Sequence, residues 1–177
     1  MRDGFPHPVN VGLGFAFAFA LSSLFFATFD PFETENPTQQ LRVGDLDGDG
    51  KDDLFLATGH AWYYSSGGQT EWRFLSYKKE TIGQILFGDF DGDGRTDVLT
   101  QQGNDLLVSW GGISDWRKIN ESTGRLSDLA IGDFVGDRRA DVLFARGDQW
   151  FVSDGGVGQF VPIRTPVSPA GRIASGH

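Results

Sequence analysis

Aspartate residues recur in this chain at a spacing that suits metal binding. Residues 45–53 read DLDGDGKDD and residues 89–97 read DFDGDGRTD. A third copy, residues 133–141, reads DFVGDRRAD, and successive copies begin 44 residues apart. Carboxylates at positions 1, 3, 5 and 9 of a loop, with glycine at positions 4 and 6, are oxygen ligands arranged around a hard cation. The loops therefore predict calcium sites, and their regular interval predicts a repeat protein.

The first two loops carry a full set of ligands. Alternate residues of a tight loop can turn their side chains toward one centre, and calcium takes six to eight oxygens. Four clustered carboxylates without a cation would repel one another and raise their own pKa values. The chain has no Cys and its three His lie outside the loops, so zinc and copper are poorly supported. The predicted ligands are the side chains of Asp45, Asp47, Asp49 and Asp53 with the carbonyl of Lys51, and those of Asp89, Asp91, Asp93 and Asp97 with the carbonyl of Arg95.

Interpretations other than calcium binding explain the first two loops poorly, but they suit the third loop better. Solvated turns also use Asp and Gly, but they do not require four aspartates in register. An EF-hand needs a Glu at position 12, where this chain has Leu56 and Thr100. In the third copy Val135 removes one ligand and Arg138 replaces the second glycine. We expect a metal-free turn there, with an ion held by Asp133, Asp137 and Asp141 as the alternative.

Each 44-residue unit is predicted to hold four short strands. The third strand is apolar at consecutive positions, so both of its faces must be covered. The fourth strand is more polar and admits Pro162, which is typical of a sheet edge. Four-stranded sheets repeated radially are β-propeller blades. The expected strands are Leu41–Gly44, Ile85–Gly88 and Leu129–Gly132, then Leu54–Ala57, Val98–Thr100 and Val142–Ala145, then Ala61–Ser65, Asp105–Ser109 and Gln149–Ser153, with fourth strands beginning at Glu71, Asp115 and Gln159.

The fold class is therefore predicted as all-β, with repeats at 41–84, 85–128 and 129–172 and the start of a fourth at 173–177. Three units fall short of the roughly four to eight blades of a closed propeller. We interpret the chain as an incomplete propeller, either a segment of a longer one or a subunit that completes its sheets by self-association. Repeated Gly-Gly pairs after the third strands predict hairpin turns.

The loop pattern resembles the FG-GAP or VCBS-type repeat, which occurs in the propellers of integrin α subunits and of many bacterial surface and secreted proteins. The resemblance rests on the sequence apolar-x-apolar-Gly-Asp-apolar-Asp-Gly-Asp-Gly-x-x-Asp-apolar and covers residues 41 to about 172. It implies Ca²⁺ in the loop between the first two strands of each blade. The third loop departs from the pattern, and the Gly-Ala-Pro part of the family signature has no match.

The first forty residues differ from the repeats. Residues 11–29 carry no charge, and Ala20-Leu21-Ser22 offers a small-x-small cleavage sequence. We interpret residues 1–32 as an export signal or membrane anchor and residues 33–40 as a polar lead-in. The alternative is a hydrophobic strand pair from an earlier, decayed blade.

Composition and motifs argue against two classes of function, nucleic-acid binding and catalysis. A net charge of −9 argues against nucleic-acid binding, and no nucleophile–base set or phosphate loop is present, so an enzyme is not expected. Trp110 breaks the repeat at a turn and is a candidate ligand contact. We predict a secreted or cell-surface calcium-binding module that mediates binding or adhesion to a protein or glycan. The alternative is a carbohydrate-binding propeller or an accessory module of a secreted hydrolase.

Overall fold

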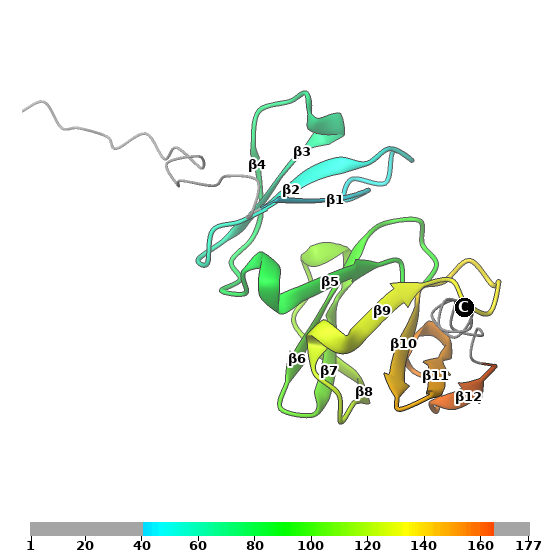
Figure 1. Cartoon of the computed structure of the whole chain (residues 1–177). Coiled ribbons are helices and arrows are strands. Elements are labelled where there is room, and N and C mark those ends of the chain that lie inside the picture. Colours follow the sequence, from blue (N-terminus) through cyan, green and yellow to red (C-terminus); the bar gives the residue numbers. More distant parts are fainter. Residues whose placement is uncertain (1–40, 165–177) are drawn as a thin grey trace, which may run out of the picture. The chain divides into compact units, whose positions relative to one another are not determined.

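The structure, a computed structural model, describes residues 41–164 as three four-stranded antiparallel sheets (Figure 1), which we call blades 1 to 3. The expected leader at 1–32, the lead-in at 33–40 and the start of a fourth repeat lie outside the described residues. The strands are β1 (Leu41–Gly44), β2 (Asp53–Ala57), β3 (Trp62–Ser65) and β4 (Arg73–Ser76) in blade 1, β5 (Ile85–Gly88), β6 (Asp97–Gln102), β7 (Asp105–Ser109) and β8 (Arg117–Glu121) in blade 2, and β9 (Leu129–Gly132), β10 (Asp141–Arg146), β11 (Gln149–Ser153) and β12 (Val161–Ile163) in blade 3.

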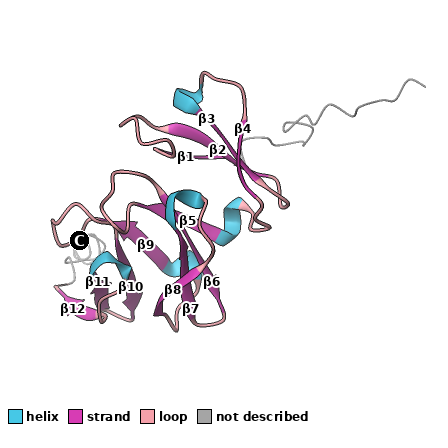
Figure 2. Ribbon diagram, turned by 180° about the vertical axis from the view of Figure 1, so that it is seen from behind, coloured by secondary structure: helices cyan, strands magenta, loops and turns pink. Residues whose placement is uncertain are grey.

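The predicted all-β architecture of four-stranded blades is confirmed. Strands follow chain order in every sheet, so β4, β8 and β12 are edges. Pro162 lies in β12, where its missing N–H costs no hydrogen bond to a further strand. The only helices between residues 41 and 164 are single 3₁₀ turns (Figure 2), and none is long or apolar enough to cross a membrane. Three blades do not close a ring.

The acidic loops occupy one position in all three blades. Each joins the first two strands, whose register brings Gly44 opposite Asp53, Gly88 opposite Asp97, and Gly132 opposite Asp141. The last aspartate of each loop is thus the first residue of the second strand. The hairpin formed by the first two strands fixes the first and last residues of the loop. Because the repeats are 44 residues long, the same hairpin geometry recurs in each blade.

The Gly-Gly pairs form a different turn from the hairpin that the sequence indicated. Each pair completes a 3₁₀ turn that follows the third strand: η2 (Ser66–Gly68), η4 (Trp110–Gly112) and η6 (Asp154–Gly156). The first glycine of each pair has a φ of 56–58°, a conformation that side-chain-bearing residues rarely adopt. Because the turn uses several residues, the fourth strands begin about two residues later than predicted, at Arg73, Arg117 and Val161.

Apolar side chains of neighbouring blades form the two hydrophobic cores. In the first, Phe55 and Trp62 of blade 1 pack with Ile85 and Val98 of blade 2. The Phe55 ring lies edge-on to Phe87, with centroids 4.9 Å apart. The second core repeats this arrangement between blades 2 and 3, and Trp110, the candidate ligand contact, packs against it half-buried. The aromatic residues thus cover blade faces, which a stack of sheets requires.

A second repeated contact joins neighbouring blades beside the acidic loops. The N–H of Thr96 donates to the carbonyl of Asp45 at 2.6 Å, and the N–H of Ala140 donates to that of Asp89 at 2.6 Å. The glycine before each accepting aspartate leaves room for this approach. A Cβ on Gly88 would lie 2.5 Å from the Cβ of Ala140. We call this pair of features the blade joint.

The blade joint predicts a large cost for a methyl group at Gly88. Gly88→Ala should lower the free energy of unfolding by about 1–3 kcal/mol, because overpacked sites force backbone shifts. In Gly83→Ala the new Cβ meets no atom within 4 Å, so stability should stay within about 0.5 kcal/mol of the parent or rise slightly. Urea denaturation measures both. Equal stability of the two variants would contradict the close approach at the joint.

Candidate metal centres

Carboxylates from the first two acidic loops converge in the same way in blades 1 and 2. In blade 1, one oxygen from each of Asp45, Asp47 and Asp53 lies within 4.8 Å of the others. Blade 2 repeats the group with Asp89, Asp91 and Asp97. Six of the eight predicted carboxylate ligands are therefore brought together as two groups of three.

The ninth residue of each loop is buried and ties the loop to the 3₁₀ turn of its blade. Asp53 accepts hydrogen bonds from the N–H of Leu46 at 2.9 Å and of Asp47 at 3.3 Å with one oxygen, and from the N–H of Gly67 at 2.8 Å with the other. Asp97 does the same with Phe90 and Gly111, at 2.8 and 2.7 Å. These bonds fix the orientation of the carboxylate. Sequence reasoning predicted it as a ligand but missed its role as a structural anchor.

The first residue of each loop is also held by backbone groups. Asp45 accepts the N–H of Gly48 at 2.7 Å and of Gly50 at 2.8 Å. Both glycines have φ near 80°, which turns their N–H groups inward at no steric cost. Asp89 makes the equivalent bonds to Gly92 and Gly94. Two of the three carboxylates in each group are thus pre-oriented by the loop itself.

The fifth residue of each loop stands apart from the group of three. Asp49 instead pairs with Lys51, whose ammonium lies 2.9 Å from its carboxylate. Asp93 accepts the N–H of Arg95 at 2.8 Å. The Arg95 side chain reaches blade 1, where it donates to the carbonyl of Leu46 at 2.7 Å. The Lys51 side chain is therefore in an ion pair, and the Arg95 side chain is in a contact between blades. The sequence predicted the backbone carbonyls of these two residues as ligands.

The donor chemistry of the first two groups fits a hard divalent cation. All the convergent side chains are carboxylates, and each carboxylate has about four lone-pair sites, only some of which accept backbone N–H groups here. Asp47 accepts one bond, from Asp49 at 3.3 Å. Its lone pairs and those of Asp91 are the most available for a cation. Three carboxylates would offset the +2 charge of the ion.

Burial shifts the pKa of one carboxyl group in these two clusters. The pKa of Asp97 is raised from 3.8 to about 6, chiefly because burial disfavours the charged carboxylate. The N–H groups of Gly111 and Phe90 oppose this rise, and the neighbouring Asp91 and Asp93 add to it. A bound cation would favour the ionised form of the group.

The third loop gathers a different set of carboxylates. Asp137, Asp141 and Asp154 lie within 4.8 Å of one another, while Asp133 accepts the N–H groups of residues 136, 137 and 138. Asp154 comes from the 3₁₀ turn η6, and its counterparts in the other blades are Ser66 and Trp110. Sequence reasoning did not single out Asp154, although its departure from the repeat was visible. The carboxylate lost at Val135 is replaced from another element.

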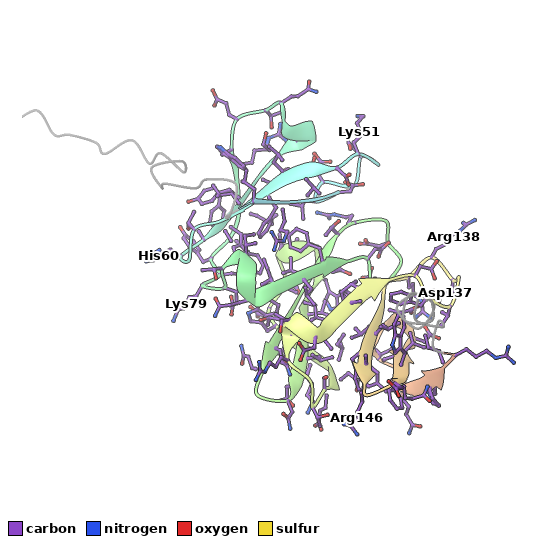
Figure 3. All side chains as sticks on the ribbon, viewed as in Figure 1. Lys51, His60, Lys79, Asp137, Arg138 and Arg146 are labelled. Atoms are coloured by element: carbon purple, nitrogen blue, oxygen red, sulfur yellow. The ribbon has the colours of Figure 1, made fainter. Side chains whose placement is uncertain are left out.

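Arg139 forms ion pairs with two of the three carboxylates that converge in blade 3. The Arg139 guanidinium contacts Asp137 at 2.6 Å and Asp154 at 2.9 Å. The backbone and guanidinium hydrogen bonds from Arg139 hold the pKa of Asp137 below its usual value. Arg138, labelled with Asp137 in Figure 3, takes a φ of 72° where the other loops have glycine. The Arg139 guanidinium thus supplies positive charge beside two of the three carboxylates, and the metal-free turn expected from the sequence stays a prediction.

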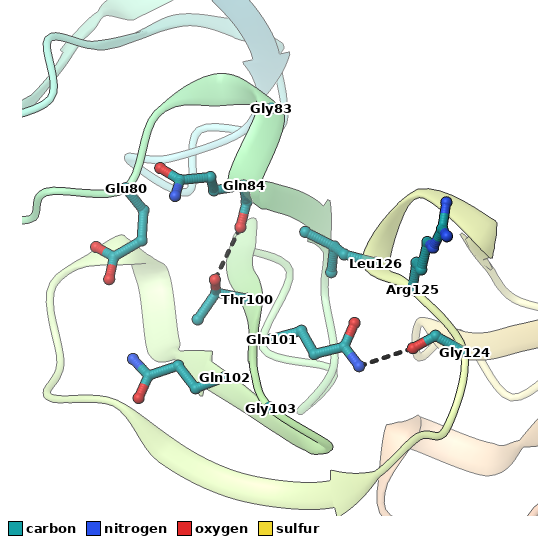
Figure 4. A pocket seen from close by; sticks show the side chains of 10 residues that line it. All are labelled: Glu80, Gly83, Gln84, Thr100, Gln101, Gln102, Gly103, Gly124, Arg125 and Leu126. Atoms are coloured by element: carbon teal, nitrogen blue, oxygen red, sulfur yellow. Dashed lines mark hydrogen bonds between the residues drawn. The ribbon is translucent and has the colours of Figure 1, made fainter.

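Blade 2 also borders a polar cavity, at the end of β6 that is remote from Asp97. The cavity measures about 540 Å³ and is lined by Glu80, Gln84, Gln102 and Arg125 among others (Figure 4). Thr100 donates to the carbonyl of Gln84 at 2.8 Å in its wall. Its lining includes no aromatic side chain, so it lacks the stacking surface that a sugar ring commonly uses.

Comparison with known proteins agrees with the loop pattern. Residues 45–100 match the family described as FG-GAP-like repeat. This stretch begins at Asp45, the first predicted ligand of loop 1, and runs through loop 2 into β6, so it contains both complete groups of three carboxylates. No curated protein matches the chain. The resemblance predicted from the sequence is confirmed for this stretch.

The raised pKa of Asp97 predicts a pH dependence in the metal-free protein. A carboxyl whose pKa rises from 3.8 to about 6 on folding stabilises the fold at low pH and loses that contribution as pH rises through 6. The unfolding free energy of metal-depleted protein should therefore fall more steeply between pH 4 and 7 in the parent than in Asp97→Asn. Thermal melts across this range measure the difference. A parent curve that rises relative to the variant would contradict the assignment.

The contacts of Arg139 predict that it stabilises its loop more than Lys51 does. Arg139→Met leaves Asp137 and Asp154 without their shared cation, and should lower the denaturation midpoint in metal-free buffer. Lys51→Met removes one exposed pair and should lower the midpoint less. Chemical denaturation at low salt compares the two. Equal losses would show that Arg139 is only a surface ion pair.

Proposed function

We propose that this chain is a non-catalytic, calcium-dependent binding or adhesion module of the extracellular or cell-surface space. The observation that carries the proposal is the convergence of three carboxylates at the same place in two successive blades. The FG-GAP-like match over residues 45–100 supports the propeller-type module, and such repeats are typically extracellular.

Calcium suits these loops better than magnesium. Magnesium demands near-ideal octahedral geometry at about 2.0–2.1 Å, whereas calcium accepts more oxygens in irregular arrangements at about 2.3–2.6 Å. Asp45 and Asp53 are held by backbone N–H groups, while Asp47 is less constrained. Asp49 is exposed and paired only with its neighbour Lys51, so it can join the ligand set by a side-chain rotation. Water would complete the coordination.

The loops connect ion binding to the packing of the blades. The carbonyl of Asp45 accepts the N–H of Thr96, and that of Asp89 accepts the N–H of Ala140. An ion that orders a loop therefore also orders its contact with the next blade. We propose that calcium stabilises the fold of this chain, because a sequence without Cys cannot use disulfides for that purpose. The bound ions would also offset part of the net charge of −9.

The supply of calcium favours an extracellular site. Loops of this ligand charge and exposure are expected to bind with Kd of roughly 10⁻⁴–10⁻³ M, which millimolar extracellular calcium fills. The partner would be a protein or glycan bound on the blades. The half-buried packing of Trp110 and the absence of aromatic residues from the polar cavity do not favour the carbohydrate-binding alternative.

Calcium titration tests the proposal. Isothermal titration of chelator-treated protein should give a stoichiometry near two and a Kd of roughly 10⁻⁴–10⁻³ M, and calcium should raise the melting temperature. Asp91→Ala should reduce the stoichiometry to one, because it removes the least constrained ligand of blade 2. Asp137→Ala should leave it at two, because Arg139 occupies the third group.

The paired variants separate the sites from general loss of charge. Each removes one loop carboxylate, so their net charges are equal. Absence of any calcium heat in the parent would overturn the proposal. Equal reductions in Asp91→Ala and Asp137→Ala would show that the third loop also binds an ion.

A further inference from the structure

We infer that the polar cavity beside blade 2 binds a short peptide that carries both a free amino group and a free carboxylate. The inference rests on the binding role proposed above and names a class of partner for it. It does not involve the acidic loops, because the cavity lies at the end of β6 that is remote from Asp97.

The end of β6 that borders the cavity is polar, unlike its counterparts in the other blades. The three equivalent residues read LAT at 56–58 in blade 1, TQQ at 100–102 in blade 2 and FAR at 144–146 in blade 3. Thr100 is 3% exposed and replaces the fully buried Leu56 of blade 1. Burying polar groups costs stability unless they are hydrogen-bonded. Blade 2 therefore has polar side chains where the fold itself accepts apolar ones.

Two of these polar side chains hold the opposite walls of the cavity (Figure 4). Thr100 donates its hydroxyl to the carbonyl of Gln84 at 2.8 Å, in the segment that joins β4 to β5. Gln101 donates its amide to the carbonyl of Gly124 at 2.8 Å, in the segment that joins β8 to β9. The leucine and alanine of blade 1 cannot donate such bonds. The walls are therefore pre-organised by residues particular to blade 2, which lowers the cost of binding a ligand.

The amide side chains of the lining keep hydrogen-bonding capacity for a ligand. Gln84 Oε1 accepts the N–H of Thr81 at 3.0 Å, which leaves its Nε2 group to donate. Gln101 uses its Nε2 group in the wall and keeps its Oε1 as an acceptor. The Gln102 side chain is exposed and makes no hydrogen bond within residues 41–164. Each peptide group offers one donor and one acceptor, so side-chain amides complement it in both senses.

Glu80 and Arg125 add opposite charges to the lining. Figure 4 shows them on opposite sides of the cavity, Glu80 beside Gln84 and Arg125 beside Leu126. Neither side chain forms an ion pair within residues 41–164. The carbonyl of Glu80 accepts the indole N–H of Trp62 at 2.8 Å, which holds the main chain there and leaves the carboxylate free. A ligand amino group suits Glu80, and a ligand carboxylate suits the guanidinium fork of Arg125.

A short peptide is the ligand class that uses all of these groups together. The cavity volume of about 540 Å³ lies within the roughly 300–1,000 Å³ of small-molecule sites and is far larger than a single ion needs. An anion such as phosphate would pair with Arg125 but would meet the negative charge of Glu80. The lining contains no aromatic side chain for a sugar ring to stack on. A zwitterionic peptide satisfies both charges and the amide groups between them.

NMR titration of the isotope-labelled full chain with triglycine tests the inference. Triglycine has both charged termini and two peptide groups. The amide signals of Gly83, Gly103 and Gly124, which line the cavity, should shift in a saturable way. A ligand of about 13 non-hydrogen atoms is expected to bind with a Kd of roughly 10⁻³ M. N-acetyltriglycine, which lacks the amino group, should bind more weakly because Glu80 then has no partner.

Two variants assign the ends of the peptide. Glu80→Gln should raise the Kd of triglycine about three- to tenfold and leave that of N-acetyltriglycine unchanged. Arg125→Gln should raise the Kd of both peptides, because both carry a carboxylate. The matched controls Glu71→Gln and Arg117→Gln remove the same charges at exposed positions outside the cavity, and should bind both peptides as the parent does.

Four outcomes would overturn the inference. Absence of saturable shifts, or shifts centred on residues outside the cavity, would exclude a peptide site here. Equal weakening in the control variants would reduce the effect to net charge. Shifts of the three glycine signals with glucose but not with triglycine would assign the cavity to the carbohydrate-binding alternative.

Calcium titration of the same samples keeps this inference separate from the proposed metal sites. Two bound ions without peptide binding would contradict the peptide site alone. Peptide binding without any calcium heat would support the peptide site and contradict the metal sites alone.

Discussion

A buried carboxylate at the end of each acidic loop is the constraint on which the rest of the structure depends. Asp53, Asp97 and Asp141 are fully or almost fully buried and accept N–H groups from both the acidic loop and the 3₁₀ turn of their own blade. A buried charge is tolerated only when such partners satisfy it. Each of these residues therefore fixes the shape of the loop, the position of the turn and the start of the second strand together.

The geometry that this anchor imposes serves packing as well as ion binding. The loop presents a carbonyl to the next blade and carboxylates to a common centre, so the blade joint and the proposed metal site share residues. Because a sheet with two apolar faces is stable only when both are covered, the joint repeats between each pair of neighbouring blades. The outer faces, where Phe134 and Val43 remain exposed, are the places where this requirement is not met by residues 41–164.

Blade 3 shows that the scaffold can be kept while the set of convergent carboxylates changes. Asp141 retains the anchor bonds to Phe134 and Gly155, but Arg139 bridges Asp137 and Asp154. A guanidinium supplies positive charge that does not depend on calcium in solution. Stability of the three blades would then respond differently to calcium depletion, with blades 1 and 2 more sensitive than blade 3.

The sequence by itself determined the all-β class, the strand order, the edge position of the fourth strand and the location of the acidic loops. These follow from local rules, such as a repeat of fixed length and the conformations that Asp, Gly and Pro favour. Only the tertiary structure decided that Asp49 pairs with Lys51, that Asp154 joins the third loop and that Trp110 packs in a core. Those outcomes depend on contacts between elements or on competition among nearby charges, and residue spacing does not encode the distances involved.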